Sequence, residues 1–318
     1  MPSERSKPQG TEPRPPASAD VSTNSSPGER RQKKALLGEP ELRTMVGEQM
    51  QTLAHEMSQG KSQRLQEYLD FASRFHRYSR SNQFLIWLQR PTATQVASYR
   101  HWQDEGYQVA KGETGIRILA PSMRKRTNTE TGEDERVVVG FVAVSVFDVD
   151  QLTPEKRPAP FFVPLEGDQE AFCARIIQAA TADGFNVAEE DQTHGAEGYN
   201  RGRDIVTRWG LASVNRALTL LHEYAHGLLH QDHALAEERP LTRDLKECHA
   251  EATAYVVARH FGIENPFSAD YLLQWGTTPE RLREELDAVS KAASHIIQTL
   301  HAQEPGEGPR HDSEGMDE

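Results

Sequence analysis

Residues 217–230 read ALTLLHEYAHGLLH and decide the expected fold of the second half of this 318-residue chain. Their apolar residues recur around a few polar ones, so the stretch predicts a helix. His222, Glu223 and His226 form the pattern His-Glu-x-x-His. Positions four apart lie on one face of a helix, so both imidazoles can reach one metal ion. Glu223 can then serve as general base toward a water at that ion, which is the working arrangement of a zinc hydrolase.

A catalytic zinc ion takes three protein ligands and keeps one position open. Residues 245–262 (LKECHAEATAYVVARHFG) have helical apolar spacing and carry Glu247 and Glu251 four apart, on one face. We assign Glu247 as the third ligand and Glu251 as the carboxylate that orients a ligand histidine. The order resembles the Glu-x-x-x-Asp helix of the thermolysin-like gluzincins, in which the first acid binds metal. The reversed assignment stays open.

The alternative interpretation of both segments is an ordinary helix whose polar face is solvated. It is weakened by the apolar surroundings, because burying histidines and carboxylates without a partner is costly.

Four further histidines receive no role. His230 and His233 follow the motif and are interpreted as lying off the spacing of the first pair. His249 shares a helix with Glu247 but is expected to point elsewhere. His260 is interpreted as a surface histidine near a helix end.

The two ends of the chain differ in composition from the middle. Residues 1–40 and 303–318 are rich in proline, serine, glycine and charge, so we expect two disordered tails, the second of them acidic. An apolar run long enough for a signal peptide or a membrane span is missing, so we expect a soluble protein with no membrane partner. Cys173 and Cys248 lie far apart and form no disulfide framework, which fits a cytoplasmic location.

The net charge of −12 is unevenly distributed. Residues 61–147 carry 13 Lys/Arg against 9 Asp/Glu, whereas residues 167–301 carry 12 against 21. This asymmetry indicates two domains with different partners. We place them at residues 41–155 and 167–302, joined by a Pro-rich linker at 156–166.

The first domain is expected to contain helices followed by a small antiparallel sheet. The expected elements are a helix around 65–75, an apolar segment at 84–88, a short helix at 96–106, two strands within 107–120, a charged loop at 123–136 and a strand at 137–149. The predicted fold class is therefore α+β, with a zincin-like (gluzincin) metallopeptidase domain in the second half.

Aromatic and basic residues are mixed in the first domain. Single-stranded DNA is held by stacking on aromatic rings and by cations along the phosphates. The candidate DNA-binding residues are Arg80, Trp102, Lys111, Arg124, Lys125 and Arg126. The alternative is that the aromatics form a core and the basic loop is merely solvated.

Residues 78–121 (YSRSNQFLIWLQRPTATQVASYRHWQDEGYQVAKGETGIRILAP) resemble the N-terminal domain of ArdC-like antirestriction proteins. The shared features are an Asn in a Tyr/Ser-rich lead-in, a Trp in the following helix and a Lys-Gly-Glu-x-Gly turn. They correspond to Asn82, Trp102 and residues 111–115. The resemblance implies single-stranded DNA binding and adds Asn82 to the DNA-binding candidates.

The resemblance extends over about residues 60 to 300. That family's second domain is a zincin-like metallopeptidase with a His-Glu-x-x-His helix and an Ala-rich helix containing a Glu, here Glu247. The family implies a protein of mobile genetic elements that protects incoming DNA, with Zn2+ as cofactor and zinc-dependent peptidase activity as an open question.

The second domain is also similar to the ImmA/IrrE peptidases, which cleave repressors. The alternative function is therefore a regulatory zinc peptidase with a protein or peptide substrate. The strand-like segment around Ile205 and Val206 would align an extended peptide by edge pairing. A third interpretation makes the zinc a purely structural ion.

Overall fold

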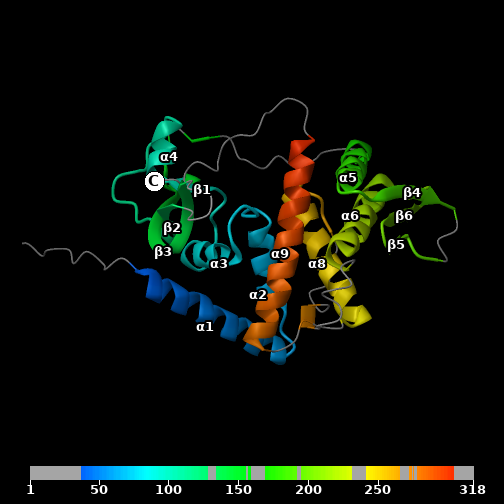
Figure 1. Cartoon of the computed structure of the whole chain (residues 1–318), viewed down its shortest axis with the longest axis horizontal. Coiled ribbons are helices and arrows are strands. Elements are labelled where there is room, and N and C mark those ends of the chain that lie inside the picture. Colours follow the sequence, from blue (N-terminus) through cyan, green and yellow to red (C-terminus); the bar gives the residue numbers. More distant parts are fainter. Residues whose placement is uncertain are drawn as a thin grey trace, which may run out of the picture. The chain divides into compact units, whose positions relative to one another are not determined.

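The computed structural model describes residues 37–127, 134–154, 157–158, 169–191, 195–230, 241–265, 272–273, 275 and 278–303. Helices combine with two small sheets, so the predicted α+β class is confirmed (Figure 1). His233, most of the expected linker and nearly all of both expected tails lie outside the described residues. Among the helices that can be described, none is both long enough and apolar enough to span a membrane.

Three helices open the described chain: α1 (Glu39–Ser58), α2 (Gln63–Ala72) and α3 (Arg80–Gln89). Helix α1 begins inside the expected tail, and Pro40 lies in its first turn, where the fixed φ of proline suits a helix start. It is absent from the sequence-based expectations, although its buried residues recur every three or four positions. These residues are Leu42, Val46, Met50, Leu53 and Met57.

The first sheet is antiparallel, in the order β1-β3-β2. Its strands are β1 (Val96–Ser98), β2 (Ile116–Thr127) and β3 (Asp134–Asp148), and helix α4 (Tyr99–Asp104) follows β1. A short 3-10 helix, η1 (Val149–Gln151), follows β3.

Two expectations about this region are wrong. The described residues of the charged segment 123–136 are not a loop, because β2 and β3 extend into the segment from both ends and pair as far as Thr127 with Asp134. Cross-strand hydrogen bonds satisfy the backbone there whatever the charge of the exposed side chains. Residues 107–120 contain one strand instead of two, since Val109 forms only an isolated bridge with Leu152.

The described residues of the second half contain a mixed three-stranded sheet and four long helices. The helices are α5 (Glu170–Ala182), α6 (Ser213–His230), α8 (Arg243–His260) and α9 (Pro279–Ala302). The strands are β4 (Asn186–Glu190), β5 (Gly198–Arg201) and β6 (Asp204–Arg208).

Strand β6, which contains Ile205 and Val206, is the central strand of this sheet. It pairs in parallel with β4 and antiparallel with β5. The expected edge pairing of a peptide with this strand is therefore wrong, because both of its backbone edges are already hydrogen-bonded. The edges of the sheet belong to β4 and β5.

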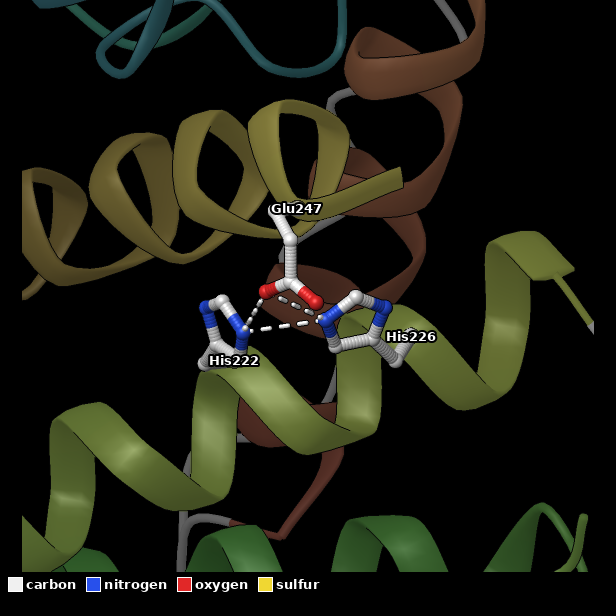
Figure 2. A group of neighbouring side chains, drawn as sticks. All are labelled: His222, His226 and Glu247. Carbon is white, nitrogen blue, oxygen red and sulfur yellow. Dashed lines mark hydrogen bonds and ion pairs between the residues drawn. The ribbon is translucent and has the colours of Figure 1, made fainter. Parts of the chain in front are cut away.

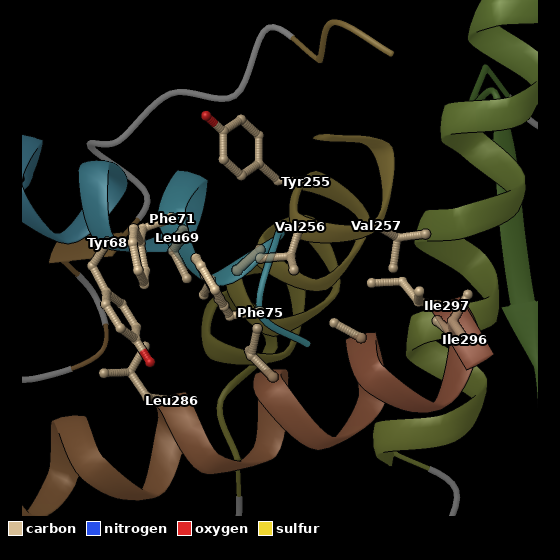
Figure 3. Packing of buried hydrophobic residues seen from close by; sticks show 14 of the residues in the cluster. Tyr68, Leu69, Phe71, Phe75, Tyr255, Val256, Val257, Leu286, Ile296 and Ile297 are labelled. Carbon is tan, nitrogen blue, oxygen red and sulfur yellow. The ribbon is translucent and has the colours of Figure 1, made fainter. Parts of the chain in front are cut away.

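Buried residues of the two halves belong to one hydrophobic cluster (Figure 3). Tyr68 of α2 stacks on Phe84 of α3 at 4.0 Å between ring centroids. Val256 of α8 and Leu286 of α9 belong to the same cluster. The Tyr255 hydroxyl of α8 donates to Asp70 of α2 at 2.5 Å. The division into domains at residues 156–166 stays a prediction, whereas the shared core is a feature of the fold.

A buried histidine in this core makes stability depend on pH. Burial lowers the pKa of His76 to about 2, and the nearby His260, Arg77 and His301 act in the same direction. In the unfolded chain a histidine titrates near 6.5. The unfolded state therefore binds more protons below pH 6.5, and stability should fall there by about 1.4 kcal/mol per pH unit from this group alone.

Urea unfolding between pH 7.5 and 5 measures this dependence. In His76→Phe the slope of stability against pH should be smaller by about 1.4 kcal/mol per pH unit, the contribution of one proton. An identical slope in both proteins would show that His76 is protonated in the folded state.

Candidate metal centre

Helices α6 and α8 pack against each other and carry the residues of the His-Glu-x-x-His pattern and its downstream acid. The start of α8 is held by Thr242, whose Oγ1 accepts a hydrogen bond from the backbone N–H of Leu245. This cap lies just over one turn before Glu247. Figure 2 shows the Glu247 carboxylate directed between the rings of His222 and His226.

The three side chains form a compact group of possible ligand atoms. The Nε2 atoms of His222 and His226 are 3.0 Å apart, and Oε2 of Glu247 is 3.4 Å from each of them. A tetrahedral ion with bonds of about 2.0–2.1 Å separates its ligand atoms by about 3.3 Å. The residues therefore fit a zinc-sized divalent ion with little movement, and among the described residues this is the one such group.

The protonation preferences differ among the three members of the triad. Burial by itself lowers the pKa of His222, but the hydrogen bond to Glu247 and the charge of Glu251 raise it above its ordinary value. The bond with His222 lowers the pKa of Glu247 to about 2, against the opposing effect of burial. Burial, followed by the charge of His222, lowers the pKa of His226 to about 4. Neutral His226 and ionised Glu247 are the ligand forms of these groups.

Glu223 lies beside the triad, 7 % exposed. The pKa of Glu223 is raised to about 7, mainly by burial. The charge of His222 opposes this rise, whereas the charges of Glu247 and Glu251 add to it. Strand β5 passes close to this side chain: a Cβ added to Gly198 would lie 3.3 Å from Cγ of Glu223 and 2.5 Å from Cγ2 of Thr219. Glycine is therefore required for the edge strand to approach α6 this closely.

Glu251 lies on the far side of the first ligand. Its Oε1 is 3.5 Å from Nδ1 of His222, the ring nitrogen that does not face the triad. A carboxylate at that nitrogen orients the ring and favours a lone pair on the other nitrogen.

Two expectations about the remaining histidines, those for His230 and His260, are wrong, whereas His249 contacts residues outside the triad, as expected. His230 is a further four residues along α6 and its Nδ1 lies 3.0 Å from Nδ1 of His226. His249 turns toward His230, with Nδ1 3.5 Å from Nε2 of that residue. His260 is buried, and its Nδ1 donates to the Ser73 carbonyl at 2.8 Å. The spacing of four residues from His222 to His226 to His230 was sufficient to predict the position of His230. The partners of His249 and His260 lie in distant segments and could not be predicted in this way.

Two of the DNA-binding candidates have buried side chains that contact the backbone of the fold. The Asn82 amide donates to the carbonyl of Leu119 and accepts from its N–H, both at 2.9 Å. The indole N–H of Trp102 donates to the Phe147 carbonyl at 2.8 Å. Both side chains connect a helix to the first sheet.

The basic candidates lie in different environments. Arg80 is largely buried and pairs with Asp287 of α9 at 2.5 Å. Lys111 is exposed, next to Gly112, whose φ of +95° favours glycine. Residues 124–126 are consecutive and exposed on β2.

The fold and the site define a mixed α+β protein with a two-histidine, one-glutamate triad suited to a divalent metal. Residues 41–147 match the family model of the N-terminal domain of anti-restriction factor ArdC. Residues 41–147 are therefore similar to that domain, as the sequence resemblance predicts.

An uncharacterized protein of Bacillus anthracis is 24 % identical over 282 residues, which are 74 % of this chain and 47 % of that protein. The chain thus spans about half the length of this curated relative.

Two solved structures are also similar, both of the antirestriction ArdC protein from plasmid R388. The metal-free one is 17 % identical, covering 71 % of this chain and 86 % of that one with a TM-score of 0.46. The Mn(II)-bound one is 18 % identical, covering 70 % and 83 % with a TM-score of 0.43.

Proposed function

We propose that this protein is an ArdC-like antirestriction protein that binds single-stranded DNA through its first half and a divalent metal ion through its second half. The match of residues 41–147 to the ArdC N-terminal domain supports the first part. The spacing of His222, His226 and Glu247 is the single observation that carries the second part. Two histidines and one carboxylate favour zinc.

The exposed part of the β2–β3 hairpin is the surface best suited to DNA. Lys125 stands directly across from Arg136 in the ladder, so that a phosphate can approach two cations at once. Arg43 lies over the half-exposed ring of Phe141, 5.4 Å from its centroid. Large exposed apolar residues accompany the cations: Met123, Val138, Val139, Phe141 and Val142. This mixture of cations and apolar surface suits the phosphates and bases of a single strand.

A salt series of oligonucleotide binding tests this surface. In Arg124→Ser/Lys125→Ser, the slope of log affinity against log salt should become shallower by about 0.7 for each lost phosphate contact, hence about 1.4 in total. The matched control Arg201→Ser/Arg208→Ser removes two exposed cations from the second sheet and should leave the slope unchanged. An equal loss of slope in both double variants would indicate a general charge effect. Equal affinity of the unmodified protein for duplex DNA would contradict a preference for single strands.

The second half has the groups of a peptidase, and this favours a second candidate function, a regulatory zinc peptidase of the ImmA/IrrE kind. A zinc ion at the triad would supply Lewis-acid activation of a water molecule and of a carbonyl oxygen. Glu223, with a pKa of about 7, can accept and return a proton near neutral pH. Strand β5 is a sheet edge adjacent to Glu223, which an extended peptide could join.

Glu223→Gln tests this chemistry. The variant should bind zinc as the unmodified protein does, because Glu223 is not among the three ligands. The rate of cleavage of fluorescently labelled unstructured peptides should fall about 10²–10⁴-fold, the usual contribution of a general base. Full cleavage by the variant would remove Glu223 from the reaction. Absence of cleavage by the unmodified protein would leave a binding protein with a metal centre and exclude the peptidase function for these peptides.

A further inference from the structure

A line of side-chain contacts leads away from the triad through the interior. It runs from Nδ1 of His226 to Nδ1 of His230 at 3.0 Å, and from Nε2 of His230 to Nδ1 of His249 at 3.5 Å. Nε2 of His249 then lies 2.5 Å from Oε2 of Glu285 on α9. The line therefore joins α6, α8 and α9.

One proton arrangement satisfies every contact when Nε2 of His226 faces a metal ion. That nitrogen must then present a lone pair, so Nδ1 of His226 carries the proton and donates to His230. His230 donates from Nε2 to Nδ1 of His249, which in turn donates from Nε2 to the Glu285 carboxylate. The reverse direction would place a hydrogen on the metal-facing nitrogen of His226 and require a protonated Glu285.

The far end of the line, at His249 and Glu285, is buried and fully paired. His249 and Glu285 are only 3 % and 1 % exposed. Arg281, one turn before Glu285 on α9, places Nε 2.6 Å from Oε1 of the same carboxylate. A buried carboxylate is costly unless it is paired and hydrogen-bonded, and here each oxygen has a partner. The ionised acceptor therefore sets the direction of the whole line.

We propose that His230, His249 and Glu285 are positioning residues that hold His226 in its metal-binding tautomer and ring orientation. This inference rests on the proposed metal centre. In most metal sites a carboxylate or carbonyl bonds directly to the outer nitrogen of a ligand histidine. Glu251 lies at the corresponding position beside His222, with Oε1 3.5 Å from Nδ1. For His226, two intervening histidines transmit the effect of Glu285.

Cobalt(II) and zinc(II) binding to the full chain tests the inference. In His230→Phe the zinc affinity, measured by competition with a chromophoric chelator, should fall about 10–100-fold. The visible absorption bands of bound cobalt should also shift, because the ring of His226 loses its fixed orientation. His230→Asn, whose side-chain oxygen can accept from Nδ1 of His226, should recover much of the affinity. His55→Phe, an exposed histidine of α1, is the matched control and should bind like the unmodified protein.

Glu285→Gln provides a second test should the phenylalanine variant fold poorly, and its affinity should fall in the same direction. Affinity within about twofold of the unmodified protein, with unchanged cobalt bands, would overturn the inference even if the metal-free variants melt at lower temperature. That result would make the line a purely structural network. An unmodified chain that binds neither ion would overturn the metal centre itself, and the two failures are thus distinguishable.

Discussion

Glu247→Ala should abolish tight zinc binding, whereas Glu251→Ala should weaken it only about 10–100-fold. Glu247 supplies one of the three atoms that lie 3.0–3.4 Å apart, so its loss leaves two ligands. Glu251 lies instead beside the outer nitrogen of His222, outside the triad. Competition with a chromophoric chelator measures both affinities, and circular dichroism verifies the folds.

The matched control is Glu280→Ala, which removes an exposed acid from the first turn of α9. It should bind zinc with unchanged affinity, because its charge lies outside the triad. A larger loss in the Glu251 variant than in the Glu247 variant would reverse the two assignments. Equal affinity in all three variants would exclude α8 from the metal site.

Trp102→Ala should lower the free energy of unfolding by about 3–5 kcal/mol. Trp102 is 2 % exposed and forms a small core with Val109 and Leu152. Its truncation leaves a cavity and also leaves the Phe147 carbonyl without the indole donor. Denaturant unfolding, followed by circular dichroism, measures the loss.

Trp209→Ala is a control of the same chemistry, because Trp209 is 68 % exposed. It should change stability by no more than about 0.5 kcal/mol. DNA binding by the Trp102 variant should decline only in proportion to the unfolded fraction. Weaker binding by a fully stable variant would instead make Trp102 a DNA contact, as the sequence predicts.

The local features of the site were predictable because they depend on helix geometry alone. A spacing of four residues puts His222 and His226 on one face of a helix, and the same rule applies to Glu247 and Glu251. The same reasoning was sufficient for His230 and for α1, whose periodicity is clear in the sequence. The α+β class likewise follows from apolar periodicity, and the structure confirms it.

The strand predictions were weaker for a physical reason. A charged, turn-rich segment is typical of a loop, yet residues 124–126 belong to a long hairpin. In a hairpin the backbone ladder is satisfied regardless of which side chains face solvent, so composition is a poor guide to where strands end. Similarly, the sequence of a strand such as β6, taken alone, does not indicate whether the strand is central or at the edge of its sheet.

By itself the sequence indicated which residues could chelate a metal, since two histidines four apart on one helix and two acids four apart on a later one are local patterns. Only the tertiary structure decided that Asn82 and Trp102 are buried, and that His249 and Glu285 connect to His226. These contacts join residues that are far apart along the chain or on different helices. They are decided by how helices and sheet pack to bury apolar surface and pair polar groups, and no short-range pattern encodes that packing.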